Sequence, residues 1–119
     1  MLLLSGFVIN KRVMGELAVS RSIGDSDFKE NGLKLVIATP EVEHVQLQES
    51  DDFLLLACDG LFDVMADGEA VSWLRNHLVQ HNDPDMAVRD LVRHSIQNLS
   101  SRDNVSAILV CFKSRFSVD

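Results

Sequence analysis

Three aspartates stand at positions where a carboxylate is unusual, and they are the best candidates for chemistry in this chain. Asp59 directly follows the apolar run of residues 53–58, and Asp63 comes four residues later. Asp103 comes just before a second apolar run, residues 105–112. An unpaired carboxylate at the mouth of a buried strand is costly, so it needs a cation, a basic partner or several N–H donors. The three positions therefore predict a polar site.

The two apolar runs are expected to bring these carboxylates together. Both runs predict strands, and the unbroken run 53–58 is typical of a strand that is buried on both faces. If the two strands are antiparallel neighbours, the end of the first meets the start of the second. Asp59 and Asp103 would then converge on one edge of the sheet. A helical turn after Asp59 would point Asp63 the same way.

Clustered carboxylates with no histidine or cysteine motif beside them favour hard cations, namely Mg²⁺, Mn²⁺ or Ca²⁺, over zinc. Their spacing does not match the calcium loop of an EF-hand. Plainer interpretations remain open for each residue. Asp59 with Gly60, which permits a tight turn, is also an ordinary turn dipeptide, and Asp63 is also an acid of a first helical turn. Asp103 with Asn104 is also an Asx turn.

The remaining elements predict an α+β fold. Residues 42–47 indicate a strand with one solvated face. Asp67–His81 has the apolar spacing of a helix that Asp67 caps. Asp83 followed by Pro84 marks the start of a second helix. The first third of the chain contains four glycines and is expected to be rich in loops.

Composition limits the class of protein. The chain has 119 residues, enough for a single domain over residues 1–119, and 46% of them are hydrophobic. A net charge of −7 argues against nucleic acid as a partner. No apolar stretch approaches the ~20 residues of a membrane span, so no membrane association is expected. Cys58 and Cys111 lie in apolar runs without zinc-site spacing, which predicts free thiols and a reducing compartment, the cytoplasm and/or the nucleus.

Four motifs, in order and at sensible spacing, resemble the PP2C (PPM) family of metal-dependent protein serine/threonine phosphatases. They are residues 12–25 (RVMGELAVSRSIGD), 39–41 (TPE), 57–64 (ACDGLFDV) and 101–105 (SRDNV). The resemblance implies part of a four-layer α-β-β-α sandwich with antiparallel sheets. It also implies hydrolysis of phosphoserine and phosphothreonine in proteins by metal-activated water, without a covalent phospho-enzyme.

The resemblance assigns roles to the same three carboxylates. Asp59 matches the aspartate that bridges the metal centre, and Asp103 matches a further ligand of the second metal. Asp63 matches the acid that helps to hold a weaker third metal in some members. The implied cofactor is Mg²⁺ or Mn²⁺, and the implied partner is a phosphoprotein substrate. The SR-x-x-GD motif at residues 20–25 is expected to be supporting architecture, not a ligand.

The resemblance covers only the C-terminal part of the family's catalytic domain. The family's Asp-Gly-His motif, its early Glu-Asp pair and its phosphate-binding arginine have no counterpart here. We therefore expect an incomplete two-metal site and weak or no activity in the isolated chain. Two other possibilities stay open: a pseudophosphatase or interaction fragment that binds a partner through open sheet edges, and completion of the domain by a separate N-terminal fragment or by self-association.

Overall fold

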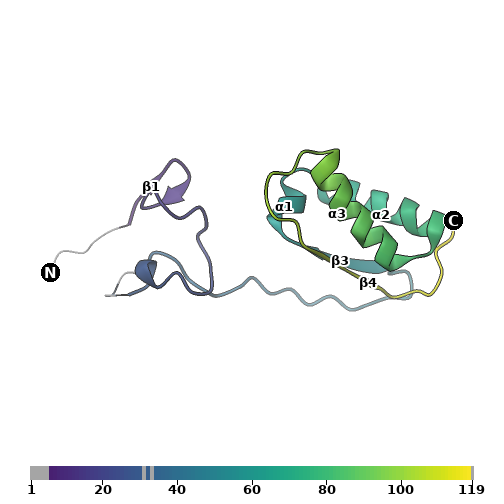
Figure 1. The fold of residues 1–119 in the computed structure, drawn as a ribbon. Coiled ribbons are helices and arrows are strands. Elements are labelled where there is room, and N and C mark those ends of the chain that lie inside the picture. Colours follow the sequence, from purple (N-terminus) through teal and green to yellow (C-terminus); the bar gives the residue numbers. More distant parts are fainter. Residues whose placement is uncertain (1–5, 31, 33, 119) are drawn as a thin grey trace. The chain divides into compact units, whose positions relative to one another are not determined.

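The computed structural model describes residues 6–30, 32 and 34–118. It divides into two compact units, Met1–Val45 and Gln46–Asp119, each of which is described by itself (Figure 1). The second unit holds all the longer elements and all three candidate aspartates. Its helices and antiparallel strands confirm the α+β class that the sequence predicted.

Two helices lie on one face of a two-stranded sheet in the second unit (Figure 1). The chain runs through β3 (Phe53–Ala57), α1 (Asp59–Phe62), α2 (Asp67–His81), α3 (Pro84–Gln97) and β4 (Ala107–Cys111). The strands β3 and β4 pair antiparallel over their full length. The core between sheet and helices consists of buried apolar side chains: Leu61, Met65, Ala70, Leu74, Leu78, Ala87 and Leu91.

Only one face of this sheet is covered among the described residues, which corrects the prediction that residues 53–58 form a strand with both faces buried. Burial alternates along β3: Phe53 and Leu55 pack against the core, whereas Leu54 and Leu56 are each 48% exposed. The strand β4 alternates in the same way. Side chains point to opposite faces at successive positions, and the helices cover one face alone. The other face therefore presents an apolar surface made of Leu54, Leu56, Ile108, Val110 and Phe112.

Local sequence explains where both long helices begin. The helix α3 begins as predicted, because the Asp83 carboxylate accepts a hydrogen bond from Met86 N at 3.0 Å and Pro84 takes the first helical position. The prediction that Asp67 caps α2 is wrong, since Asp67 is the first helical residue and Ala66 precedes it. Glu69 stabilises the start of α2 instead, because its carboxylate accepts a hydrogen bond from Ala66 N at 3.0 Å.

The first unit contains little regular structure, as its glycines predicted. The strands β1 (Val8–Ile9) and β2 (Arg12–Val13) form an antiparallel hairpin. Asn10 and Lys11 connect them with φ values of 50° and 61°, as in the tight turns that match the twist of a hairpin. A short 3-10 helix, η1 (Ser26–Phe28), follows.

The predicted strand over residues 42–47 does not form. These residues are exposed and carry no regular secondary structure. A short apolar alternation is not sufficient without a neighbouring strand to accept its backbone hydrogen bonds. None of the helices that the structure describes has the length and apolar character needed to cross a membrane.

Candidate functional site

The antiparallel pairing of β3 with β4 places two candidate aspartates at the same end of the sheet. Ala57, the last residue of β3, lies opposite Ala107, the first residue of β4. Asp59 begins α1 immediately beyond that end, and Asp103 lies in the loop that leads into β4. The prediction that the two strands are antiparallel neighbours is confirmed, and the segments that carry the two carboxylates therefore lie at the same end of the sheet.

Hydrogen bonds tie the loop that carries Asp103 to the segment that carries Asp59. Cys58 N donates to Ser106 O at 3.2 Å, and Cys58 Sγ lies 3.3 Å from both Asn104 O and Ser106 N. Ser101 Oγ donates to Gly60 O at 2.7 Å. These contacts fix the two backbones against each other on both sides of the aspartates. Sequence reasoning missed them, because hydrogen bonds between segments about forty residues apart leave no periodic signal.

Gly60 matters for a different reason from the one expected. It lies in α1 with an ordinary backbone conformation, so no turn requires its flexibility. A Cβ atom at this position would lie 2.1 Å from Asn104 O and 3.0 Å from the adjoining carbonyl carbon. Only glycine therefore lets the loop that carries Asp103 approach the start of α1 this closely.

Asp63 follows Asp59 through one helical turn, as expected if the chain turns helically after Gly60. The backbone amide of Asp63 donates to Asp59 O at 2.8 Å. Asp63 lies at the C-terminal end of α1. Residues four apart share one side of a helix, so Asp59 and Asp63 lie on the same side of this turn.

All three carboxylates are exposed, which corrects the picture of a charge at the mouth of a buried strand. Among the described residues, no ion pair involves Asp59, Asp63 or Asp103. Asp103 Oδ1 accepts a hydrogen bond from Asn104 N at 2.7 Å. This contact joins adjacent residues, so it is not the hydrogen bond of an Asx turn, which reaches the backbone amide two residues on. The charges of the three carboxylates are therefore balanced by solvent and mobile cations.

The donor chemistry suits a hard cation, but the described residues do not form a closed site. Exposed carboxylates without basic partners are the oxygen ligands that Mg²⁺ and Mn²⁺ take. Among the described residues, no group of three or more His, Cys, Asp or Glu side chains is placed to hold a metal ion. The assignment of Asp59, Asp63 and Asp103 as metal ligands thus stays a prediction. A shallow hollow of about 300 Å³ lies at the paired ends of β3 and β4, lined by Leu56, Ala57, Cys58, Ser106, Ala107 and Ile108, and none of the three aspartates lines it.

The SR-x-x-GD motif is a structural element of the first unit. Arg21 Nη2 lies 3.4 Å from Glu41 Oε1, so the motif contacts the TPE motif at residues 39–41. The backbone supports the same contact, because Ser22 N donates to Ile37 O at 2.9 Å. Gly24 and Asp25 have φ values of 82° and 48°, and they turn the chain into η1. The supporting role of the motif stays a prediction.

Comparisons with known proteins identify what the chain is similar to. The sequence profile of the family described as "Protein phosphatase 2C" matches residues 3–105. The chain is 40% identical over 111 residues to "Probable protein phosphatase 2C 47" of Oryza sativa subsp. japonica. It is 35% identical over 116 residues to "Probable protein phosphatase 2C 43" of Arabidopsis thaliana. The matches cover 92% and 93% of this chain but only 28% and 27% of these relatives.

A solved structure has a similar fold over most of this chain. A chain described as "Structure of a C.elegans sex determining protein" superimposes on this one with a TM-score of 0.77 and 27% sequence identity. The match covers 92% of this chain and 26% of that chain. The present chain thus corresponds to about a quarter of the solved chain and of the curated relatives.

Proposed function

The chain belongs to the protein phosphatase 2C family, and we propose that it contributes half of a two-metal centre for hydrolysing phosphoserine and phosphothreonine in proteins. In this proposal Asp59, Asp63 and Asp103 are ligands of Mg²⁺ or Mn²⁺. The activity belongs to the whole domain, whereas this chain spans about 28% of the rice relative. The isolated chain is inactive or only weakly active.

The observation that carries the proposal is the shared end of β3 and β4. This pairing brings the segments of Asp59 and Asp103 side by side, although the two residues are 44 positions apart in the sequence. The contacts of Cys58, Gly60 and Ser101 hold the two segments in that position. Two carboxylates whose segments are tied to one end of a sheet hold their positions better for binding a metal than two carboxylates on unconnected loops.

The chain's own residues supply binding and orientation. Asp59 and Asp103 attract a divalent cation through their negative charge, and Asp63 adds a third carboxylate one helical turn from Asp59. A bound divalent cation supplies activation of water and neutralisation of charge on a phosphoryl group. Since no basic side chain pairs with these carboxylates among the described residues, a cation need not displace an existing ion pair.

The test has two arms. The purified, folded chain is assayed with Mn²⁺ and p-nitrophenyl phosphate, where we expect no turnover above the Asp59→Asn control. A chimaera of the rice relative, whose matching segment is replaced by this chain, is then assayed on a phosphoserine peptide. We expect Mn²⁺-dependent activity that falls at least a hundredfold with Asp59→Asn. A folded chimaera without activity, or one indifferent to Asp59→Asn, would contradict the proposal.

The apolar sheet face supports a second candidate role, in which the chain associates with a complementing N-terminal fragment or with a second copy of itself. The residues Leu54, Leu56, Ile108, Val110 and Phe112 expose between 41% and 63% of their surface on this face. Such a contiguous patch is uncommon on a monomer. Sedimentation velocity on the isolated chain tests the self-association version: a clean monomer at high concentration would remove it. If the chain is a non-catalytic binder, Asp59→Asn with Asp103→Asn leaves association unchanged.

A further inference from the structure

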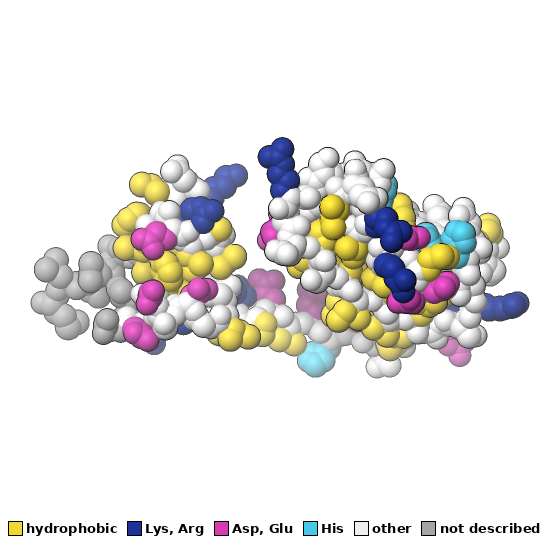
Figure 2. Space-filling model, viewed as in Figure 1, with side chains coloured by type: hydrophobic (Ala, Val, Ile, Leu, Met, Phe, Trp, Pro, Cys, Tyr) yellow, Lys and Arg dark blue, Asp and Glu magenta, His cyan; other side chains and the backbone are white. Residues whose placement is uncertain are grey.

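A cluster of aromatic and histidine side chains lies between α2 and α3, away from the sheet end that carries the aspartates. Trp73 stacks on His77 and on His94, with ring centroids 5.1 and 5.6 Å apart. His81 follows His77 by one helical turn, and their ring centroids are 4.6 Å apart. Figure 2 shows histidine atoms at the surface of the helical layer, next to acidic and basic side chains. Neither the proposed phosphatase chemistry nor the core requires two adjacent imidazoles here.

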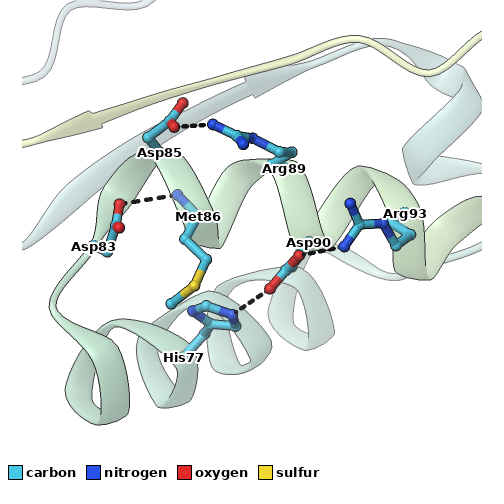
Figure 3. A network of polar contacts seen from close by, with 7 residues as sticks. All are labelled: His77, Asp83, Asp85, Met86, Arg89, Asp90 and Arg93. Carbon is cyan, nitrogen blue, oxygen red and sulfur yellow. Dashed lines mark hydrogen bonds and ion pairs between the residues drawn. The ribbon is translucent and has the colours of Figure 1, made fainter.

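The hydrogen bond of His77 assigns its tautomer. His77 Nε2 lies 3.0 Å from Asp90 Oδ2, and Asp90 Oδ1 lies 3.0 Å from Arg93 Nη1 (Figure 3). A carboxylate that is ion-paired to arginine can only accept, so Nε2 carries the proton and donates. In the neutral ring the lone pair is then on Nδ1. The carboxylate thus orients the imidazole and leaves Nδ1 as its basic atom.

His77 Nδ1 has no partner in this arrangement. It is buried and makes no hydrogen bond with any described residue. Figure 3 shows the Met86 side chain reaching toward the His77 ring, so an apolar group covers part of this imidazole. A buried acceptor without a partner costs free energy, because it has lost its hydrogen bond to water without gaining another. A ligand that engages this lone pair would recover that cost, and the neighbouring His81 ring is exposed, with its centroid 4.6 Å from that of His77.

We propose that His77 and His81 bind a first-row divalent transition metal ion, of the class represented by Cu²⁺ and Zn²⁺. Imidazole nitrogens suit these ions, and a histidine pair at positions i and i+4 of a helix lies on one face. A carboxylate that accepts the other N–H of a ligating histidine is the usual outer-shell partner of such an ion, and Asp90 has that place.

The site uses two imidazoles, with water in the remaining positions. The site is independent of the hard-cation centre proposed at Asp59, because imidazole and carboxylate donors select different ions. The two proposals can therefore fail separately.

Trp73 provides a built-in reporter, since it is the only tryptophan in the chain and its ring stacks on His77. The full chain is titrated with Cu²⁺, which quenches nearby indole fluorescence, in the presence of excess Mg²⁺. We expect quenching that saturates at one equivalent and is reversed by Zn²⁺ competition. His81→Gln, a change at an exposed position, removes the saturable phase. Asp90→Asn weakens Cu²⁺ affinity about 10- to 100-fold.

The matched control is His94→Gln, which also alters a ring stacked on Trp73 but removes no proposed ligand. It is expected to retain the wild-type titration, as is Asp59→Asn. Far-UV circular dichroism verifies that each variant is folded. Unchanged saturable quenching in His81→Gln, loss of quenching in His94→Gln, or quenching without saturation would each overturn the histidine site while leaving the phosphatase proposal untouched.

Discussion

Replacing Gly60 with alanine tests whether the start of α1 and the loop that carries Asp103 are packed as tightly as the structure indicates. The added Cβ would lie 2.1 Å from Asn104 O and 3.3 Å from Val105 Cγ2. Contact at normal separation requires the backbones to move apart by roughly 1 Å or more. The obstacle is the Asn104 backbone carbonyl, which itself accepts a hydrogen bond from Cys58 Sγ, in a loop that Ser101 Oγ also ties to Gly60 O. It therefore cannot yield as a flexible side chain would.

The expected loss of stability follows from two opposing effects. Overpacking of a well-packed site typically costs about 1–3 kcal/mol, and this contact with fixed backbone belongs near the upper end of that range. Alanine regains up to about 1 kcal/mol over glycine within a helix. We therefore expect the free energy of unfolding to fall by roughly 2 kcal/mol.

The assay is urea denaturation followed by Trp73 fluorescence and circular dichroism. With a denaturant slope of about 1–2 kcal/mol per molar urea, the midpoint should fall by about 1–2 M. Gly68→Ala is the matched control, because nothing lies within 4 Å of its Cβ position and it lies in α2. That variant should be equal to or more stable than the wild type. A Gly60→Ala midpoint equal to that of Gly68→Ala would refute the close approach.

Two further predictions concern stability. Hydrogen bonding from Lys113 holds the pKa of Asp52 below its ordinary value of 3.8, and Arg75 adds to this effect against the influence of burial. A lowered folded-state pKa contributes stability above the unfolded-state value, and that contribution is lost as pH falls through the folded-state pKa. Urea midpoints measured from pH 7 to pH 2.5 should therefore fall in acid. Asp52→Asn should be less stable at pH 7, by roughly 1–3 kcal/mol, and should show a smaller acid loss; an equal acid loss would contradict the assignment. Ser100 has a φ of 58°, so Ser100→Gly should raise the melting temperature through relief of about 1 kcal/mol of strain, whereas Ser72→Gly in the interior of α2 should lower it. Equal shifts in the two serine variants would show that the left-handed conformation carries no strain.

Much of the second unit could be predicted from the sequence because its signals are local. The bounds of α2 and the cap of α3 follow from apolar spacing, Asp83 and Pro84, and the antiparallel pairing of the two apolar runs is confirmed. The exposed face of β3 could not be predicted. An unbroken apolar run indicates that both faces of the strand avoid water, but it does not show which part of which chain covers each face.

The candidate site shows the same limit. Asp59, Asp63 and Asp103 could be selected as candidate site residues from their positions beside apolar runs and from the family motifs. Their surroundings could not, because they depend on contacts between distant segments, such as Ser101 Oγ with Gly60 O. Gly60 is instructive, since its identity suggested a flexible turn, whereas its place in the fold requires the absence of a Cβ.

Paramagnetic broadening by Mn²⁺ in the ¹⁵N–¹H spectrum of the folded chain tests most directly whether these aspartates hold a divalent cation. If Asp59 and Asp103 share one cation, substoichiometric Mn²⁺ should broaden amide signals around residues 59–63 and 101–105 together. Asp59→Asn should remove the broadening from both segments at once, because one ion causes both effects. Broadening that is absent, that lies elsewhere, or that persists at residues 101–105 in Asp59→Asn would contradict a shared metal site.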